Sequence, residues 1–596
     1  AAEDVAEATR RENPPLPPPT AARAERNGPE AIDHLSIEDV AFTSFPQLEE
    51  VPDSYKAQWA YANCDVVDWI VQAADEAELV RALKWWLILH TALLRQNARK
   101  KSRGAKRNGT RRDGDHYAKR FQLWADGDFT ALIKQWERAK KNITPIDRRH
   151  AKDQEEKRIA QAFKYAARCQ LSRCRGRLLS KGVYDLADER AQAQLDAKHI
   201  HRTERLPGRL NPPEGGFDRL NIELDEAYRS LKRLAGTGPG GYRNEYLTAL
   251  ANKFNDVRAD KAIKAHETMA AKYINAELPA WFYFITSAID CLALIKRDAA
   301  TDADCPDLRP IGMGDCRRRC WTKVCVQQAT ASAAEVLAPT QVAVGVKAGM
   351  AKQLISLREY LRLHPWAAIL KIDFINAYNL LSRAEILRCI LRCRTRSIRN
   401  LGPLFWAMYS PNSPIFGLNM GSFEGLQQGD PLASLLFCLA IHDEVMRAKG
   451  ELDICNGMTF FNMDDGYIAG RPRDIFPIVT RLATRLEDRC HTKIQPSKST
   501  VYMPGPAGAE TMRHFFAANP AYAHFKIGCL DSIDAATAPS GSGFGMQIAG
   551  IPVGDDTYIY NKLKTKTDKI LEDNITLTSI LRSHSTQVLY AITIYC

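Results

Sequence analysis

The chain has 596 residues, which at about 150 residues per domain predicts three to five domains. Its hydrophobic content of 45% and charged content of 26% are ordinary for a chain that buries a core, and they exclude a largely disordered protein. Lys and Arg outnumber Asp and Glu by 82 to 70, so the net charge of +12 favours a polyanionic partner, nucleic acid before an anionic membrane.

The first third of the chain is predicted to hold a disordered leader followed by helices. Residues 1–53 form the leader, because Glu and Arg interleave ahead of a Pro-rich run at residues 14–19 that favours extended polyproline geometry. Residues 54–206 form a basic, mostly helical region, with helical periodicity at Asp75–Arg95 and a second, Arg- and Lys-rich helix at Gln154–Arg177. The chain opens without Met or a signal peptide, so we expect a fragment of a longer product.

A concentrated basic segment interrupts the helical region. Residues 95–120 contain eleven Lys and Arg against two Asp, a local charge of +9, and three Gly that predict a flexible link rather than a stiff helix. Two interpretations remain open: the segment binds template or target nucleic acid through its phosphates, or it is a solvated linker or nuclear-localisation run. The residues assigned to nucleic-acid binding under the first interpretation are Arg99, Lys100, Lys101, Arg103, Lys106 and Arg107.

A domain boundary is predicted at Pro207–Gly216, where Pro and Gly cluster. Beyond it, helices alternate with short β-rich runs such as Ala367–Phe374, which predicts an α+β fold. Gly236–Gly241 matches the dinucleotide-binding pattern GxGxxG, but Glu223–Leu234 before it has a helical pattern instead of the required strand. We therefore interpret this glycine cluster as a turn.

Cysteine, histidine and apolar patterns argue against several other classes of protein. The fifteen cysteines lack paired His at zinc-finger distance and predict reduced thiols in an intracellular compartment. The apolar runs are shorter than the roughly 20 residues that a bilayer requires, so we expect no membrane partner. A nucleophile-elbow GxSxG and a Walker loop are both absent from the sequence, which leaves hydrolase and P-loop NTPase functions without support.

Three segments in the second half have the residue types of a phosphoryl-transfer site. They are KIDFINAYN at 371–379, GLQQGDPL at 425–432 and NMDDG at 462–466. A strand end delivers Asp373, a Gly-rich turn leads into an apolar helix at Ala433–His442, and a hairpin tip carries Asp464 and Asp465. Adjacent aspartates before Gly are by themselves typical of a solvated turn. The three segments in this order instead predict a site for two Mg²⁺ ions, with Mn²⁺ as a substitute, which would stabilise both oxygens of an in-line displacement.

The same segments resemble motifs A, B and C of reverse transcriptases, most closely those of non-LTR retrotransposons. Flanking segments extend the resemblance over residues 220–596. These are GPGGYRNEYL at 238–247, Lys296 with DLRPI at 307–311, QPSKS at 495–499 and IAGIPVG at 548–554, similar to the fingers, triphosphate-binding, motif D and primer-grip segments of the family.

The resemblance implies roles for individual residues. Asp373, Asp464 and Asp465 would be the catalytic carboxylates and would hold the metal ions together with the backbone carbonyl of Phe374. An aromatic ring at Tyr378 would clash with a ribose 2′-OH and so select deoxynucleotides, which argues against an RNA-templated RNA polymerase. The residues implied to bind the incoming nucleotide are Lys296, Arg309, Phe374, Tyr378, Gln428, Gly429 and Lys498.

The resemblance also implies a right-hand polymerase fold, with fingers over residues 207–350, a palm over 351–560 and the start of a thumb over 561–596. The implied activity is RNA-directed DNA synthesis in the nucleus, with an RNA template, a DNA primer or target and dNTPs as partners. Asn462 stands where the family has Tyr or Phe. A catalytically inactive nucleic-acid-binding remnant therefore stays an alternative, as does a group II intron-like reverse transcriptase, which shares the palm.

Overall fold

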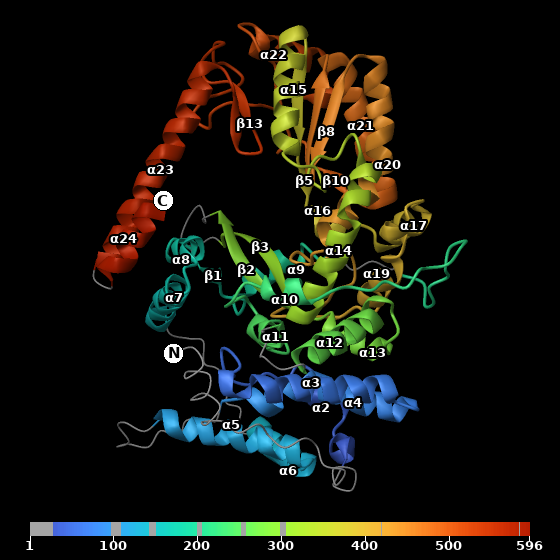
Figure 1. The fold of residues 1–596 in the computed structure, drawn as a ribbon. Coiled ribbons are helices and arrows are strands. Elements are labelled where there is room, and N and C mark those ends of the chain that lie inside the picture. The colour runs from blue at the N-terminus through green and yellow to red at the C-terminus, as the bar shows by residue number, and fades with distance from the viewer. Residues whose placement is uncertain are drawn as a thin grey trace, which may run out of the picture.

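The computed structural model describes residues 28–96, 109–141, 151–180, 182–199, 205–251, 258–297, 305–418, 420–582 and 585–595. These residues form a mixed structure of helices and several small sheets, which is compatible with the predicted α+β class (Figure 1). No helix among them is long and apolar enough to cross a membrane.

Helices and helical turns make up most of the described chain before residue 200. They are η2 (Pro29–Ile32), α2 (Ile37–Val40), η3 (Asp53–Tyr55), α3 (Lys56–Gln72), α4 (Glu76–Leu94), α5 (Gly109–Asp126), α6 (Phe129–Lys141), α7 (Ala151–Ala166), α8 (Leu171–Leu178) and α9 (Glu189–Asp196). Helix α4 begins where the Asp75 side chain accepts a hydrogen bond from the N–H of Glu78 (2.8 Å), a standard N-cap. It confirms the helix predicted at Asp75–Arg95.

Part of the predicted disordered leader is folded. Within residues 28–53, the side chain of Ile32 is fully buried, and the indole N–H of Trp85 on α4 donates to the carbonyl oxygen of Pro29 (2.9 Å). The prediction was wrong for this stretch because its scattered apolar residues gain burial against α4, which offsets the entropy lost on ordering. Residues 1–27 of the predicted leader lie outside the described residues.

Two predictions about helices in the basic region were also wrong. The predicted flexible link includes Gly109 and Gly114, but both lie in α5, whose Trp124 is almost completely buried. The helix predicted at Gln154–Arg177 is divided into α7 and α8, with Cys169 between them in a left-handed conformation at φ +54°. Tertiary packing therefore stabilises α5 despite its glycines, and the backbone conformation of Cys169 separates α7 from α8 although the sequence periodicity continues.

The N-terminal helices share one hydrophobic core with helices that follow residue 205. The latter are α10 (Asp225–Arg229), α11 (Asn244–Ala251), α12 (Arg258–Ile274), α13 (Ala280–Thr286) and α14 (Cys316–Leu337). The indole N–H of Trp59 on α3 donates to the carbonyl oxygen of Tyr246 on α11 (3.0 Å), and the rings of Trp86 on α4 and Trp321 on α14 lie 6.2 Å apart. The predicted boundary at Pro207–Gly216 therefore does not separate two cores.

A first sheet, which we call the hairpin sheet, is built around the antiparallel strands β2 (Ile289–Arg297) and β3 (Asp307–Gly314). Strand β1 (Val183–Tyr184) pairs with β2 in antiparallel fashion. Strand β6 (Pro414–Phe416) pairs with β2 in parallel and with β7 (Met420–Gly421) beyond it. The hairpin sheet thus joins segments from three distant parts of the chain.

A second sheet, which we call the central sheet, has five strands. In spatial order they are β12 (Lys526–Ile527), β11 (Thr500–Tyr502), β4 (Ala368–Ile372), β9 (Asp465–Gly470) and β8 (Met458–Asn462). Ile369 on β4 belongs to a core that includes Leu357 of α15 (Gly349–Leu363), whereas Leu370 belongs to the core that includes α20 (Ala433–Ile454) and α21 (Pro472–Cys490). Helices therefore cover both faces (Figure 1), and this is why β4 is apolar except at Lys371.

Shorter elements connect the sheets and close the chain. They are β5 (Phe374–Ile375), α16 (Ala377–Leu380), α17 (Arg383–Arg392), α18 (Arg396–Arg399), α19 (Gly402–Tyr409), β10 (Lys493–Ile494), α22 (Gly508–Ala518), η4 (Pro520–Tyr522), β13 (Gly545–Ile548), β14 (Ile551–Gly554), α23 (Asp556–Arg582) and α24 (Thr586–Tyr595). The red arm of α23 and α24 in Figure 1 runs back to α8, where Arg175 forms an ion pair with Asp573 (2.8 Å). The charged helix predicted at Lys562–Ile580 is confirmed within α23.

Candidate active-site cleft

Asp373 lies at the end of the central strand, between β4 and β5. Its N–H donates to Oγ of Ser499 (3.1 Å), and its carbonyl oxygen accepts a hydrogen bond from the N–H of Gln495 (2.7 Å). Both partners belong to the loop between β10 and β11, which contains the sequence QPSKS. The backbone of Asp373 is therefore held from both sides, and its carboxylate remains available for other contacts.

Asp464 lies in the turn between β8 and β9, and Asp465 is the first residue of β9. Met463 before them has a left-handed backbone (φ +59°), and its N–H donates to Oε1 of Gln341 (2.8 Å). The N–H of Phe461 donates to the carbonyl oxygen of Thr340 (2.6 Å), so the segment before α15 runs alongside β8. The turn is thus anchored by a segment more than a hundred residues earlier in the chain.

Asn462 is the last residue of β8, directly before this turn. It pairs with Asp465 across the hairpin. Phe460, Phe461 and Tyr467 are each 1% exposed, and the rings of Phe460 and Tyr467 stack 5.0 Å apart. Aromatic packing next to the turn is therefore supplied by the residues around Asn462.

Asp373 lies near enough to Asp464 for its charge to affect the pKa of Asp464. Solvent reaches Asp464 from the cleft, but the protein around it desolvates the carboxylate, and this burial, with the charges of Asp465 and Asp373, raises its pKa. The positive charge of Arg309 lowers the pKa of Asp464 and so opposes this shift in part. Asp465 instead turns to Lys371 on β4, with 3.2 Å between Oδ1 and Nζ.

The carboxylates of Asp373, Asp464 and Asp465 are potential ligands for a divalent cation. Mg²⁺ commonly takes one or two carboxylates and completes its shell with water and substrate phosphates. Asp373 and Asp464 suit this pattern, since they repel each other and neither makes an ion pair within the described chain. Asp465 would first have to leave Lys371. Accordingly, no three His, Cys, Asp or Glu side chains among the described residues form a ready-made metal site.

The Gly-rich turn before α20 packs directly against the hairpin sheet. The N–H of Gly312 on β3 donates to the carbonyl oxygen of Gln428 (2.7 Å). Gly429 has φ +115°, and a Cβ there would lie 2.5 Å from the carbonyl oxygen of Gly312, so the position requires Gly. The buried guanidinium of Arg383 donates to the carbonyl oxygen of Gly425 (2.9 Å), and burial lowers its pKa to about 10.

A cleft of about 1090 Å³ is lined by residues of both sheets and of this turn. It brings together every residue predicted to act in catalysis, metal binding or nucleotide binding. These residues are Lys296, Arg309, Asp373, Phe374, Tyr378, Gln428, Gly429, Asp464, Asp465 and Lys498. Their roles stay predictions, but their convergence is a property of the fold.

Five positive side chains line this cleft, as do five aspartates. The positive side chains are Lys198, Lys296, Arg309, Lys493 and Lys498. Burial opposes the ionisation of Asp307 among them, but the hydrogen bond and charge of Lys198, with the charges of Lys296 and Lys498, hold its pKa below the ordinary value. Sequence reasoning missed Lys198 and Lys493, because neither belongs to a motif and only the fold brings them here.

Tyr378 lies half-buried on the wall of the cleft. Its ring is 5.2 Å from the ring of Phe437 on α20, and the N–H of Leu426 donates to its carbonyl oxygen (2.7 Å). Burial, with a smaller contribution from the charge of Asp464, raises the pKa of its hydroxyl to about 12. The ring therefore stays neutral and is held by packing beside the acidic residues.

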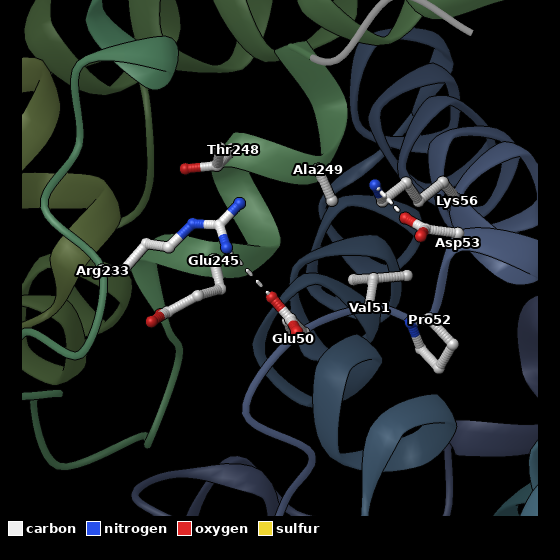
Figure 2. A pocket seen from close by; sticks show the side chains of 9 residues that line it. All are labelled: Glu50, Val51, Pro52, Asp53, Lys56, Arg233, Glu245, Thr248 and Ala249. Carbon is white, nitrogen blue, oxygen red and sulfur yellow. Dashed lines mark hydrogen bonds and ion pairs between the residues drawn. The ribbon is translucent and has the colours of Figure 1, made fainter. Parts of the chain in front are cut away.

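A second cavity, of about 280 Å³, lies between the η3 segment and α11 (Figure 2). Four of its charged residues form two ion pairs: Nη1 of Arg233 lies 3.4 Å from Oε2 of Glu50, and Lys56 pairs with Asp53. The fifth, Glu245, accepts a hydrogen bond from the N–H of Leu234 (2.5 Å). The residues that line it include none of those predicted for the site. The larger cleft is therefore the candidate active site.

Residues 97–108 of the predicted nucleic-acid-binding segment lie outside the described part of the chain. They include Arg99, Lys100, Lys101, Arg103, Lys106 and Arg107.

Comparison with known proteins assigns no family to the chain. Neither a protein-family model nor a curated protein matches its sequence. The function of the cleft is therefore argued from its own residues.

Proposed function

We propose that the chain is an RNA-directed DNA polymerase of the non-LTR retrotransposon type, which copies an RNA template into DNA from a primer 3′-OH. One observation carries the proposal: the aspartates, the Gly-rich turn and the cations of separate segments line a single cleft of about 1090 Å³. If the resemblance in sequence were due to chance, we would not expect these separate segments to lie together in one cleft.

In this proposal, Asp373 and Asp464, with the carbonyl oxygen of Phe374, would hold two Mg²⁺ or Mn²⁺ ions. Such ions activate an attacking oxygen and stabilise the charge on a leaving phosphate. The carboxylate of Asp464 suits this task because burial, with the charges of Asp465 and Asp373, raises its pKa, and bound positive charge would offset these effects. Asp465, through Lys371, orients the turn that carries Asp464.

The positive side of the cleft would bind the incoming dNTP. Arg309 matches phosphate geometry with its planar fork, and Lys296 and Lys498 add positive charge beside it. The ring of Tyr378 would lie against the sugar and leave no room for a 2′-OH. Gln428 would line the pocket from the Gly-rich turn.

The two sheets would then have the parts of a right-hand polymerase. The central sheet would be the palm, the hairpin sheet with its helices the fingers, and the α23–α24 arm the start of a thumb. RNA template and DNA primer or target would enter the cleft between them, in the nucleus. The net charge of +12 supports a polyanionic partner.

Primer extension on poly(rA)/oligo(dT) with Mg²⁺ and dTTP tests this function. We expect the wild-type chain to extend the primer and Asp373→Asn to lower the rate by at least about 100-fold, because it removes charge stabilisation in the transition state. Asp443→Asn is a matched control, since Asp443 is 63% exposed and lies outside the cleft. It should extend at the wild-type rate.

Two outcomes would change the proposal. A wild-type chain that binds primer–template but does not extend it would be the inactive nucleic-acid-binding remnant. Equal extension by the wild type and Asp373→Asn would remove the metal assignment. A group II intron-like reverse transcriptase would extend the primer in the same way, since it would share the cleft chemistry.

A further inference from the structure

A segment that precedes all the polymerase-like motifs reaches the nucleotide side of the cleft. Strand β1 pairs with β2 at the edge of the hairpin sheet, with Val183 opposite Leu294. Helix α9 follows and lies against β3: Nε2 of Gln194 donates to the carbonyl oxygen of Pro306 (2.9 Å), and Oε1 of Gln194 accepts from the N–H of Leu308 (2.7 Å). The chain leaves α9 at the mouth of the cleft.

Lys198, two residues after α9, contacts both walls of the cleft. Its Nζ lies 3.2 Å from Oδ1 of Asp307 and also donates to the carbonyl oxygen of Leu308, both on β3. Its own carbonyl oxygen accepts a hydrogen bond from Nδ2 of Asn376, which follows Asp373 and β5. One residue therefore joins the strand that carries Arg309 to the segment that carries a catalytic aspartate.

The ammonium group of Lys198 lies close to the carboxylate of Asp307, which also interacts with other positive side chains. Asp307 is within electrostatic reach of Lys198, Lys296 and Lys498, so three ammonium groups meet one carboxylate. The positive charge around Asp307 is therefore grouped at the wall of the cleft that carries Arg309. Lys198 is 26% exposed, and its flexible stem lets the ammonium exchange Asp307 for a stronger anionic partner.

We propose that Lys198 is a nucleotide-binding residue whose ammonium binds the triphosphate of the incoming dNTP, so that the region before residue 205 completes the nucleotide site. The inference rests on the proposed function. It goes beyond it by assigning triphosphate binding to a segment outside every motif that resembles the polymerase family.

A purely structural role for Lys198 makes a different prediction. If the side chain only ties α9 to β3, the carbonyl oxygen of Leu308 and Gln194 (Oε1–Nζ 3.3 Å) are its essential partners, and a neutral donor of similar size can replace it. If it binds triphosphate, the positive charge itself is required. Lys198→Gln and Lys198→Arg separate the two roles.

Binding of inorganic triphosphate with Mg²⁺ to the full chain, measured by titration calorimetry, tests the inference without requiring turnover. We expect Lys198→Gln to weaken binding about tenfold, since one charge-assisted hydrogen bond to phosphate is removed, and Lys198→Arg to stay within about threefold of the wild type. Lys526→Gln is the matched control, because Lys526 is exposed on β12 and does not line the cleft. It should bind as the wild type does.

A second measurement uses the wild-type chain and so does not depend on the folding of a variant. Lysine acetylation with a limiting amount of reagent, followed by mass spectrometry, should label Lys198 less in the presence of inorganic triphosphate, while Lys526 labels equally. Unchanged labelling of Lys198, wild-type affinity in Lys198→Gln, or no triphosphate binding by the wild type would each overturn the inference.

These results are distinguishable from failure of the proposed function. If the wild type binds triphosphate through Lys198 but does not extend a primer, the polymerase proposal fails and the anion site remains. If the wild type is active, Lys198→Gln should raise KM for dTTP about tenfold and change kcat much less, because it alters ground-state binding of the triphosphate. A fall in kcat with unchanged KM would contradict nucleotide binding by Lys198.

Discussion

The carboxylate of Asp464 combines a cost in stability with a proposed role in catalysis. Its pKa is raised by burial and by the neighbouring charges of Asp465 and Asp373, so the folded protein favours the protonated form more than the unfolded chain does. Above this raised pKa the ionised side chain lowers the free energy of unfolding. Bound divalent cations would remove this cost, which couples stability to metal binding.

We therefore expect Asp464→Asn to melt at a higher temperature than the wild type at pH 7 in EDTA, while primer extension falls at least about 100-fold. The difference in melting temperature should shrink as the pH falls through the raised pKa of Asp464, because the wild-type carboxyl then becomes neutral too. Mg²⁺ should also shrink it by stabilising only the wild type. Thermal melts across pH, with and without Mg²⁺, check this, and a lower melting temperature for the variant in EDTA would contradict it.

Tyr378 is the residue with the clearest implied role in substrate choice. Its ring is held by Phe437, and burial raises the pKa of its hydroxyl to about 12, so it acts by shape and not by charge. Tyr378→Val should open the space for a 2′-OH and raise rNTP use relative to dNTP use by at least about tenfold, the effect of relieving roughly 1.4 kcal/mol of clash. Single-nucleotide incorporation of UTP and dTTP measures the ratio.

Tyr378→Phe is the matched control, because it keeps the ring and removes only the hydroxyl. It should keep the wild-type preference for dTTP. If Tyr378→Val also keeps that preference, the ring is not the sugar gate.

At the scale of elements, the contact between β3 and the Gly-rich turn joins the two walls of the cleft. The turn offers the carbonyl oxygen of Gln428 to the N–H of Gly312, and the close approach leaves no space for a Cβ at Gly429. The spacing between the proposed triphosphate-binding strand and the proposed nucleotide pocket is therefore set by backbone contacts. This spacing in turn determines how far apart the side chains on the two walls lie.

Gly429→Ala should disturb this contact. The added Cβ would meet the carbonyl oxygen of Gly312 at 2.5 Å, and φ +115° is unfavourable for Ala, so we expect a loss of about 1–3 kcal/mol in stability together with reduced extension. Urea denaturation measures the first and primer extension the second.

Gly450→Ala provides the matched control for this prediction. Gly450 is exposed within α20, and a Cβ there would contact nothing within 4 Å. This variant should gain about 0.5–1 kcal/mol, because Ala is the better helix former. Equal denaturation midpoints for Gly429→Ala and the wild type would show that the turn tolerates a side chain.

At the scale of the whole molecule, the region before residue 205 is part of the same body as the cleft. Trp59 and Trp86 pack into the core with Tyr246 and Trp321. Strand β1 extends the hairpin sheet, and α8 contacts the α23–α24 arm through Arg175. A truncation that begins at the predicted boundary would remove part of the core and the cleft residues Ala197 and Lys198.

The basic segment at residues 95–120 gives the molecule most of its net positive charge. If it binds phosphates, changing Arg99, Lys100, Lys101, Arg103, Lys106 and Arg107 to Gln should flatten the salt dependence of RNA and DNA affinity by about 0.9 in slope for each phosphate that the variant no longer neutralises. The variant should still extend a primer at high protein concentration, since the residues of the cleft are unchanged. Binding across a salt series checks this, and equal slopes would favour the linker interpretation.

The sequence alone predicted the elements that depend on local patterns. The mostly apolar strand β4, the periodicity of α4, and the β8–β9 hairpin with its aspartates all follow from residues within one turn or strand of each other. The order of the three acidic and Gly-rich segments also predicted which residues would meet. The convergence of Asp373 and Asp464 agrees with that prediction.

Only the tertiary structure decided what depends on contacts between distant segments. It turned Asp465 toward Lys371, placed Lys198 in the cleft, closed Gly429 against Gly312 and ordered part of the leader against α4. None of these leaves a periodic signal, because each partner is chosen by shape and charge from a segment far away in sequence. Local propensity determines which elements form, whereas burial and close packing determine which of their side chains meet.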